Sequence, residues 1–223
     1  MKIWMVIPAY NEAQFLEGIL RSLKEKKLNI IVVDDGSKDS TYEVAKIRAD
    51  IVVRNEKNLG KGMALRKAIG FLLENEKFDY IITMDGDGQH SVSDIDEFIR
   101  KAENGENFVV GNRMDNPKGM PKTRILTNKV MSWLLSKMVS QSIPDTQCGF
   151  RLISRDVLEK IKFRTNKFEV ESEVLLKAAK EGFAIKSIPI QSIYFSHIKS
   201  KIHPFLDTFR FIRFLFTVND KDK

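Results

Sequence analysis

The amino-acid sequence predicts an α/β protein whose core is a mostly parallel sheet flanked by helices. Through the first half of the 223-residue chain, short continuous apolar runs alternate with segments whose apolar residues recur at helical spacing. A continuous apolar run is typical of a strand covered on both faces, and strands that alternate with helices favour right-handed crossovers between parallel neighbours. We therefore expect a Rossmann-like N-terminal half.

The first half contains five expected strands, and a helical pattern follows each of the first four. The strands are Ile3–Ile7, Ile30–Val33, Ile51–Val53, Tyr80–Met84 and Phe108–Val110. The first helix should begin at Asn11, because Gln14 three residues later gives a capping-box-like start. The other helices are expected over 38–49, from about residue 61 to Leu73, and over 93–102.

The regular alternation of strands and helices ends after Gly111. A loop at 116–121 precedes an expected helix over 123–139, and residues 143–154 are expected to be short and irregular. A helix over 170–180 should end at Gly182. A strand over 184–190 carries Pro189 near its end, which favours a sheet edge or a strand end. Residues 1–203 should form one domain, followed over 204–223 by an amphipathic helix and tail that either lies on a membrane surface or packs on the core.

Composition restricts the class of protein. The apolar content of 43% is ample for a core, so disorder is not expected. The one cysteine, Cys148, excludes an internal disulfide framework, favours a reducing compartment and should be buried. The N-terminus does not resemble a signal peptide, and no apolar run reaches the roughly 18 residues needed to span a bilayer. We expect a cytoplasmic protein, either free or peripheral on the cytoplasmic face of a membrane.

The net charge of the chain is +7, and part of the positive charge is concentrated in one basic stretch. Against Asp115 alone, it contains Arg113, Lys118, Lys122, Arg124 and Lys129. Nucleic acid is not expected as a partner, because aromatic residues are not interleaved with the basic ones and no nucleic-acid motif is present. A phosphate-bearing substrate explains the stretch better.

Three acidic turns follow expected strands, at Pro8–Glu12, Asp34–Ser37 and Asp85–Gln89. Since open α/β sheets bind ligands beyond the carboxyl ends of their strands, these turns should meet in one cleft that holds at least five carboxylates. Such a cleft favours a divalent cation and a ligand rich in hydroxyl and phosphate groups.

Asp85 and Asp87 give the strongest chemical signal. Two carboxylates two residues apart at a strand end can turn toward one cation, and Gln89 could add a carbonyl oxygen. Oxygen ligands select Mg²⁺ or Mn²⁺ over thiophilic metals. A calcium-binding loop is the specific alternative. That loop needs Asp or Asn at its fifth position and Gly at its sixth, but this sequence has Gln89 and His90 there. A polar turn without a ligand is the plainer alternative.

Two further segments have structural alternatives. The turn at Asp34–Ser37 either accepts hydrogen bonds from a ribose or a base, or caps the next helix. Residues 58–62 lie at a helix start, where N–H groups favour anions, so Lys61 would contact phosphate; a plain turn is the alternative. The segment is not a Walker A loop, because Asn55 stands where that motif needs its first glycine.

Other titratable residues give weaker signals. The three histidines are too scattered to form a zinc site, and each is expected to be a surface or satisfied polar residue: His90, His197 and His203. Glu169 and Glu171 precede or begin the expected helix over 170–180, where acids compensate the helix dipole. A role in the site is the alternative for both.

Taken together, these motifs resemble family 2 glycosyltransferases of the GT-A fold, and most closely the dolichyl- or polyprenyl-phosphate sugar (mannose or glucose) synthases. The resemblance runs from about Lys2 to Phe216. It depends on motifs in the family's order, at Ile7–Glu12, Val33–Ser37, Asn58–Gly62, Met84–His90, Gly111–Arg113, Asp145–Arg151 and Phe168–Glu169. It implies the GT-A nucleotide-diphospho-sugar transferase fold, with a catalytic domain over 1–203.

The resemblance also implies roles for individual residues. The donor nucleotide would be bound by Pro8, Tyr10, Glu12, Asp35, Gly36, Ser37, Lys61 and Asp85. The metal, Mg²⁺ or Mn²⁺, would be held by Asp85, Asp87 and Gln89. The acceptor phosphate would be bound by Arg113, Arg124 and Lys129.

The implied activity is metal-dependent, inverting transfer of a sugar from GDP-mannose or a UDP-sugar to a polyprenyl or dolichyl phosphate, with Asp87 and Arg113 catalytic. Phe195 and Ile198 depart from the synthase pattern, because an arginine and a glycine usually stand there. The alternative acceptor is a sugar hydroxyl, which needs a carboxylate base; Asp145 is the best candidate.

Two other classes remain as alternatives. A sugar-nucleotide nucleotidyltransferase shares the α/β layout, but it needs a Gly-rich loop that Pro8–Glu12 does not provide. An inactive scaffold that binds nucleotide-sugars would not require the carboxylates of Asp85 and Asp87. The oligomeric state is not predicted.

Overall fold

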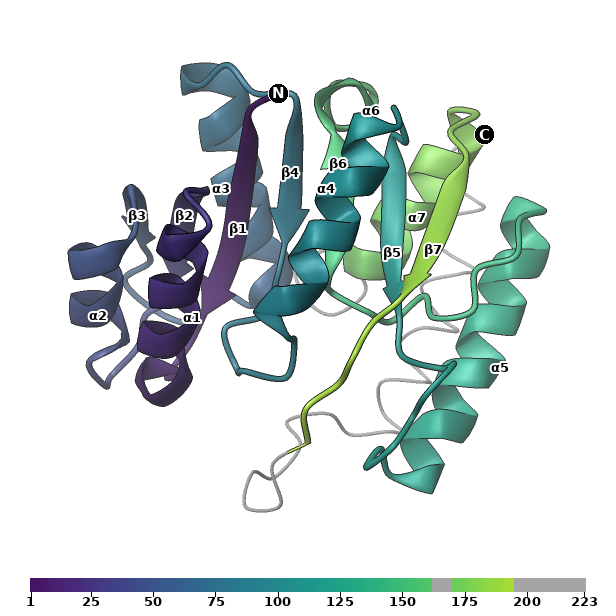
Figure 1. The fold of residues 1–223 in the computed structure, drawn as a ribbon, viewed down its shortest axis with the longest axis horizontal. Coiled ribbons are helices and arrows are strands. Elements are labelled where there is room, and N and C mark those ends of the chain that lie inside the picture. The colour runs from purple at the N-terminus through teal and green to yellow at the C-terminus, as the bar shows by residue number, and fades with distance from the viewer. Residues whose placement is uncertain (162–169, 195–223) are drawn as a thin grey trace.

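The described residues, 1–161 and 170–194, form a seven-stranded sheet with helices on both faces (Figure 1), and the structure is a computed structural model. The strands lie in the order β3-β2-β1-β4-β6-β5-β7. In chain order they are β1 (Ile3–Ala9), β2 (Asn29–Asp34), β3 (Ile51–Arg54), β4 (Tyr80–Thr83), β5 (Phe108–Asn112), β6 (Arg151–Ser154) and β7 (Ile185–Pro189). The first four strands are parallel neighbours, and β7 runs parallel to β5, which confirms the mostly parallel sheet.

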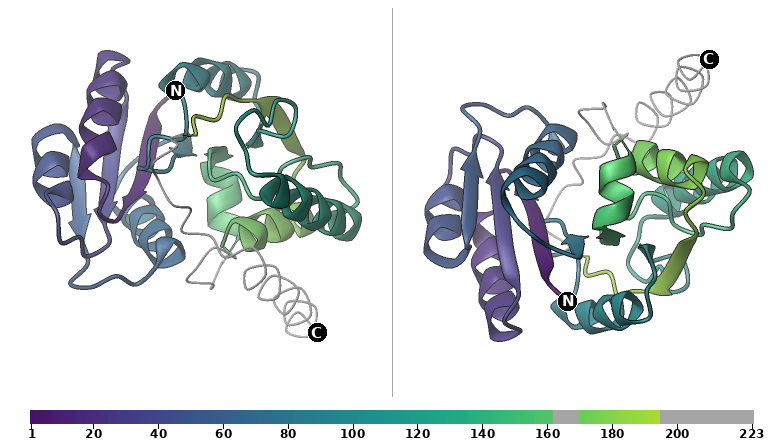
Figure 2. Two further views of the ribbon diagram at one scale, coloured as in Figure 1. Left: turned by 90° about the horizontal axis from the view of Figure 1, so that it is seen from below. Right: turned by 90° about the horizontal axis from the view of Figure 1, so that it is seen from above.

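Helices cover the two faces of the sheet (Figure 2). They are α1 (Ala13–Glu25), α2 (Thr41–Arg48), α3 (Lys61–Asn75), α4 (Ile95–Glu103), α5 (Lys122–Val139), α6 (Arg155–Lys160) and α7 (Val170–Lys180), with a 3-10 turn, η1, at Val92–Asp94. The views in Figure 2 place α1 and α4 on one side of the sheet and α3 and α7 on the other, while α5 lies beyond the β5–β7 end. The central strands are therefore buried on both faces. Met5, Val6 and Ile7 of β1 are fully buried, and each contributes about 1.5–3 kcal/mol to folding.

The segment expected to be irregular, residues 143–154, instead ends in the strand β6. This strand pairs antiparallel with both β4 and β5, so it lies inside the sheet. Its four residues are too few to show a period, and the side chain of Arg151 breaks its apolar pattern. The Arg151 guanidinium is buried because it donates to the carbonyl oxygens of Thr146, Cys148 and Glu171, at 2.9, 2.7 and 2.6 Å.

The start of α1 also differs from the expected capping box. The helix begins at Ala13, and it has no side-chain cap of its own. Its first N–H groups are satisfied from the next turn: Glu12 N donates to Thr41 Oγ1 at 2.9 Å and Ala13 N to Asp39 Oδ2 at 3.2 Å. A long-range contact thus replaces the local cap.

The last described strand, β7, lies at the edge of the sheet, as Pro189 predicts. Within 1–161 and 170–194, no helix combines the length and the apolar character that crossing a membrane requires. Several expectations fall outside the described residues: the amphipathic helix and tail over 204–223, Glu169, Phe195, His197, Ile198 and His203.

Candidate active site

The three acidic turns lie side by side at the carboxyl ends of β1, β2 and β4, as the sequence predicts. Asp35 N donates to the carbonyl oxygen of Ala9 at 2.8 Å, and Asn11 N donates to Ser37 Oγ at 2.9 Å, which joins the first turn to the second. The third turn packs on the first, because a Cβ added to Gly86 would lie 3.4 Å from Ala9 Cβ. These contacts bring together segments that are far apart in the sequence.

The carboxylates of Asp34 and Asp35 point inward, so the expectation of five carboxylates facing one cleft is wrong for this pair. Both are almost fully buried. Asp34 pairs with Arg54 Nε at 3.1 Å and accepts from Ser37 N at 3.1 Å. The oxygens of Asp35 accept from Asn55 Nδ2, Leu59 N and Gly60 N, at 2.7, 2.9 and 2.8 Å. Buried carboxylates require such partners, and here they shape the turns at 34–37 and 55–60.

Gly36 is required by this arrangement. Its φ is +75°, and an added Cβ would lie 2.6 Å from the carbonyl carbon of Lys57. On the other side of the same region, Pro8, Tyr10 and Glu12 are partly exposed at the end of β1, and Ser37 is held by Asn11. The side chains that remain accessible to a donor ligand thus come mainly from the first turn.

Lys61 connects three elements of the site. Its ammonium lies 2.6 Å from Asp85 Oδ1, just after β4, and 2.6 Å from Glu171 Oε1 in the first turn of α7. Burial alone would lower the pKa of Lys61, but the charges of Asp85 and Glu171 outweigh burial and raise it. In this structure two ion pairs engage Lys61 and keep the ammonium protonated, and its contact with phosphate stays a prediction.

Asp85 and Asp87 differ in their electrostatics. Although burial opposes it, the charge of Lys61 holds the pKa of Asp85 well below its ordinary value. The pKa of Asp87 is raised, first by burial and then by the negative charge of Asp85. A raised pKa means that the second negative charge lacks compensation, and a bound cation would supply it.

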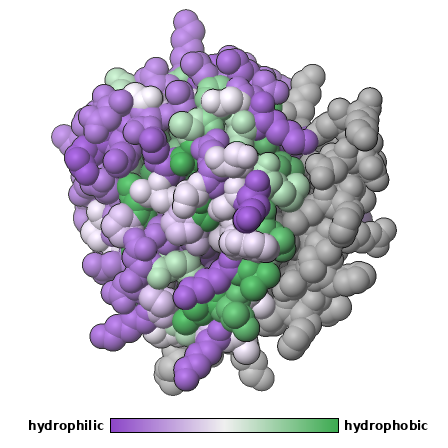
Figure 3. Space-filling model, turned by 90° about the vertical axis from the view of Figure 1, so that its right-hand side faces the viewer, coloured by the Kyte–Doolittle hydropathy of each residue, from purple (hydrophilic) through white to green (hydrophobic). Residues whose placement is uncertain are grey.

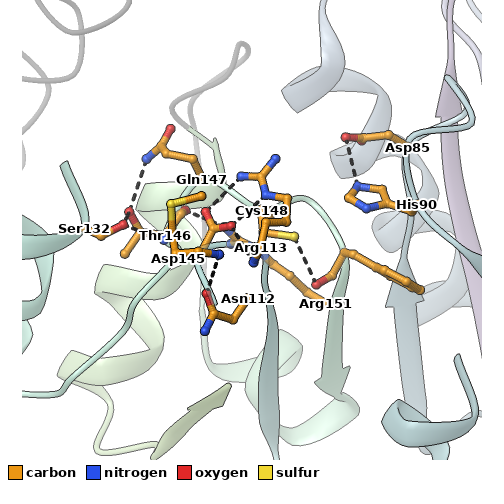
Figure 4. Close-up of polar contacts among 12 residues, drawn as sticks. Asp85, His90, Asn112, Arg113, Ser132, Asp145, Thr146, Gln147, Cys148 and Arg151 are labelled. Atoms are coloured by element: carbon orange, nitrogen blue, oxygen red, sulfur yellow. Dashed lines mark hydrogen bonds and ion pairs between the residues drawn. The ribbon is translucent and has the colours of Figure 1, made fainter. Parts of the chain in front are cut away.

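His90 lies against this pair and is buried, so of its two expected places, at the surface or as a satisfied polar residue, the first is wrong. The ring is buried, packs on Phe150 with ring centroids 5.1 Å apart, and places Nε2 3.7 Å from Asp85 Oδ2 (Figure 4). The antiparallel bridge between His90 and Ser192 holds the segment in place.

The donor set fits a hard divalent cation that is shared with a substrate. Within the described part of the chain, no group of three His, Cys, Asp or Glu side chains forms a complete metal site. Asp85 and Asp87 offer carboxylate oxygens, and Gln89 N fixes Asp87 by donating to its Oδ1 at 3.0 Å. Mg²⁺ is commonly held by one or two carboxylates together with substrate phosphates. The arrangement matches that pattern and not a closed structural site.

Arg113 and Asp145 form a buried ion pair on the other side of the site (Figure 4). Asp145 Oδ2 accepts from Arg113 Nε at 2.6 Å and from Arg113 N at 3.1 Å, while Oδ1 accepts from Nη2 at 2.9 Å. Burial would raise the pKa of Asp145, but the charge and hydrogen bonds of Arg113 lower it. For a hydroxyl acceptor Asp145 is the best candidate for the general base, but its burial, its engagement with Arg113 and its lowered pKa disfavour that role.

Arg124 faces the same region from α5. Its pKa is lowered by burial and by the positive charge of Arg113, while Asp87 and Asp145 act in the opposite direction. The charges of the acidic turn and of the Arg113–Asp145 pair therefore both act on the pKa of Arg124. Lys129, the third expected phosphate ligand, lies elsewhere: it is exposed, and five residues place it about 140° around the helix from Arg124.

Two buried donors near Arg124 were not predicted from the sequence. Asn128 lies one turn after Arg124 on the same side of α5, and within the described residues its Nδ2 has no hydrogen-bond partner. The hydroxyl of Tyr194 is likewise buried and unpaired there, and its ring lies 6.0 Å from the Arg124 guanidinium. The i, i+4 spacing from Arg124 could have indicated Asn128, whereas no local signal pointed to Tyr194.

Comparisons with known proteins agree with this geometry. The family model described as glycosyl transferase family 2 matches residues 4–162. The UDP-N-acetylglucosamine--dolichyl-phosphate N-acetylglucosaminyltransferase of Methanococcus voltae is 32% identical over 216 residues, which cover 86% of each chain.

Two solved structures share the fold at lower identity. Mannosyl-3-phosphoglycerate synthase from Rubrobacter xylanophilus superposes with a TM-score of 0.74 at 20% identity, over all of this chain and 75% of that one. Glucosyl-3-phosphoglycerate synthase from Mycobacterium tuberculosis, in complex with Mn²⁺ and UDP, gives 0.66 at 19% identity, over 88% and 73%. The GT-A fold is thereby confirmed. The chain belongs to glycosyl transferase family 2 and is a glycosyltransferase.

Proposed function

We propose that this glycosyltransferase is metal-dependent and moves a sugar, with inversion, from a nucleotide-sugar to a polyprenyl or dolichyl phosphate. The observation that carries the proposal is the pair of a buried Arg113 and a half-buried Arg124, with the charges of Arg113 and Asp87 both acting on the pKa of Arg124. A phosphate acceptor needs fixed positive charge at this place, whereas a neutral hydroxyl does not. The name of the Methanococcus voltae relative supports the same acceptor class.

The acceptor side of the site would bind the phosphate through four groups. Asp145 fixes the plane of the Arg113 guanidinium by accepting from Nε and Nη2, which leaves its other N–H groups for the phosphate. Arg124 adds a second charge, and the unpaired amide of Asn128 and hydroxyl of Tyr194 add neutral donors. Neither donor has a partner among residues 1–161 and 170–194, and buried donors without partners are uncommon, so a ligand that accepts hydrogen bonds would explain both.

The donor side would hold the nucleotide against Pro8, Tyr10 and Glu12, with the turn at Asp35–Ser37 forming the wall behind it. Asp85, Asp87 and Gln89 would hold Mg²⁺ or Mn²⁺ on the diphosphate, where the cation would stabilise the charge of the leaving group. Lys61 keeps Asp85 ionised and in place.

The transfer then needs no general base. An oxygen of the acceptor phosphate attacks the anomeric carbon as the bond from that carbon to the donor diphosphate breaks, and the electron pair leaves with the nucleoside diphosphate. Attack from the face opposite the leaving group inverts the configuration. Because the acceptor is already an anion, the low pKa of Asp145 is no obstacle, although it would be for a hydroxyl acceptor.

The site of action would be the cytoplasmic face of a membrane. The proposed acceptor is a lipid, which places the reaction at a bilayer surface. The lone buried cysteine, Cys148, supports a reducing compartment.

The test compares two acceptors that differ only in the phosphate. Transfer from GDP-mannose, UDP-glucose and UDP-N-acetylglucosamine is measured with Mg²⁺ or Mn²⁺, using a short-chain polyprenyl phosphate and the matching polyprenol. We expect one donor to give product with the phosphate, none to give product with the alcohol, and chelation of the metal to stop the reaction. Transfer to the alcohol at a similar rate would refute the phosphate acceptor, and full activity after chelation would refute metal dependence.

A further inference from the structure

The side of α5 that faces away from the site carries a row of exposed apolar side chains. Leu126, Val130 and Trp133 are 65%, 45% and 59% exposed, and Met138 at the end of the helix is 37% exposed. The first three follow each other at intervals of four and three residues, so they share one face of the helix. Single exposed apolar residues need no explanation, but a contiguous row indicates a binding surface.

The same face carries only positive charge. The sequence of α5 contains Lys122, Arg124, Lys129 and Lys137 and no acidic residue. Lys122, Lys129 and Lys137 are exposed, and their helical positions interleave with the apolar row. We call these three lysines, with Leu126, Val130, Trp133 and Met138, the outer face of α5. Figure 3 looks onto this side of the molecule and shows hydrophobic residues gathered there, with hydrophilic ones next to them.

This combination matches the chemistry of an anionic lipid surface. Tryptophan favours the boundary between headgroups and acyl chains, and lysines reach from apolar surroundings toward headgroup phosphates. Lys137 Nζ lies 5.5 Å from the centre of the Trp133 ring, so a cation and an aromatic ring are presented side by side. A helix of 18 residues is about 27 Å long, enough for several lipid headgroups to lie along it.

The inner side of the same helix faces the acceptor site. Arg124 and Asn128 lie there, roughly opposite Leu126 and Trp133 in rotation about the helix axis. We propose that the outer face of α5 binds an anionic lipid surface and thereby brings the acceptor site to the bilayer. The placement of the acceptor rests on the proposed function, whereas the binding of lipid rests on the outer face alone.

A second copy of the chain is a poorer occupant. A two-fold contact through this face would set the lysines of one copy against the lysines of the other, and like charges in an interface disfavour association. An anionic bilayer, in contrast, complements the lysines and accepts the apolar row at once.

The test uses the full chain and the fluorescence of its two tryptophans. Trp4 is buried, whereas Trp133 is exposed, so a response to vesicles reports on Trp133. We expect vesicles of phosphatidylcholine with phosphatidylglycerol to shift the emission to the blue and to protect it from acrylamide. Phosphatidylcholine alone should do so much less, and Trp133→Phe should remove the response.

Co-sedimentation with the same vesicles separates the two parts of the surface. Leu126→Gln with Trp133→Gln should weaken binding about tenfold or more, because two large apolar side chains no longer enter the bilayer. Lys129→Gln with Lys137→Gln should remove the preference for the anionic vesicles. Ile47→Gln is the matched control, since Ile47 is 77% exposed on α2, and its binding should equal wild type.

The outcomes distinguish this proposal from the proposed function. Unchanged binding of both double variants would overturn the lipid surface, and so would shielding of Trp133 from acrylamide without vesicles, which would mean that protein covers this face. Transfer to a soluble short-chain acceptor should be the same in the double variants as in wild type. If α5 binds vesicles but no phosphate acceptor is used, the lipid surface stands and the proposed function fails.

Discussion

Asp35 and Asp145 are both almost fully buried carboxylates that accept several hydrogen bonds, but from different kinds of donor. Asp35, on the donor side, accepts from neutral N–H groups of Asn55, Leu59 and Gly60. Asp145, on the acceptor side, accepts from the backbone N, Nε and Nη2 of Arg113. The Asp35 carboxylate is thus held by neutral N–H groups, and the Asp145 carboxylate by a buried opposite charge.

The two kinds of hydrogen-bond donor give the two carboxylates different roles: one fixes the shape of a turn, and the other positions a charge. A carboxylate that binds backbone N–H groups fixes a turn and leaves no cation behind it. A carboxylate paired with an arginine holds that arginine in one orientation at a place where an anionic ligand would arrive. The two sides should therefore respond differently to substitution.

Asp145→Ala should have the largest effect, because it leaves the Arg113 charge buried without a partner. We expect a loss of about 3–5 kcal/mol in the free energy of unfolding, measured by urea denaturation. Arg113→Met combined with Asp145→Leu should recover most of the stability but none of the transfer activity. A loss below about 1 kcal/mol for the single variant would contradict a buried pair.

Gly36→Ala tests the donor side, where shape should dominate. A non-glycine residue at φ +75°, with its Cβ 2.6 Å from the backbone of Lys57, should lower the stability by about 2–4 kcal/mol. Gly70→Ala is the matched control, because Gly70 lies in α3 with no atom within 4 Å of an added Cβ. This control should gain up to about 1 kcal/mol. Equal effects of the two substitutions would show that the turn at 34–37 is not constrained.

The contribution of the Cys148 thiol to stability depends on pH, and this dependence reports how far water is excluded from the acceptor side. Burial raises the pKa of its thiol to about 11, against about 8.5 in an unfolded chain. Below pH 8.5 both states are protonated, and the contribution of the thiol is complete. Above it the unfolded thiol ionises first, so stability falls as the pH rises.

The free energy of unfolding of wild type, taken relative to that of Cys148→Ala, should accordingly fall by about 2–3 kcal/mol between pH 8 and pH 10.5. Denaturant titrations of both proteins at several pH values measure this difference, in which other titrating groups cancel. A gap that does not change with pH would mean that solvent reaches the thiol.

Asp96→Asn should have the smallest effect, although Asp96 lies only 2.6 Å from Lys26. Its side chain is 68% exposed, and exposed pairs contribute about 0–1 kcal/mol. Thermal denaturation should show a change near the error of the measurement. A loss comparable with that of Asp145→Ala would mean that distance, and not burial, sets the strength of these ion pairs.

The features predicted correctly from the sequence are those encoded locally. A continuous apolar run such as Ile3–Ile7 specifies a buried strand by itself, and its order with helices specifies parallel pairing. The convergence of the three turns follows from that topology, because parallel strands end at one edge. The burial of Cys148 follows from its lack of a reactive context.

The features that could not be predicted depend on contacts across the fold. The strand β6 is four residues long and carries Arg151, whose burial depends on three carbonyl oxygens supplied by other segments. Asp145 seemed to be a base because its partner Arg113 lies 32 residues earlier in the chain. Lys61 fits a phosphate site by position, and only the fold reveals its pairing with Glu171.

The most direct test of the central claim compares two cations on one helix. Arg124→Met and Lys129→Met each remove one positive charge from α5, on its inner and outer sides, and KM is measured with a short-chain, soluble polyprenyl phosphate. We predict that Arg124→Met raises KM about 10–100-fold, the value of a charge-assisted hydrogen bond, while Lys129→Met leaves it within about twofold. An equal effect of the two variants, or none for Arg124→Met, would contradict a phosphate acceptor bound at the inner side of α5.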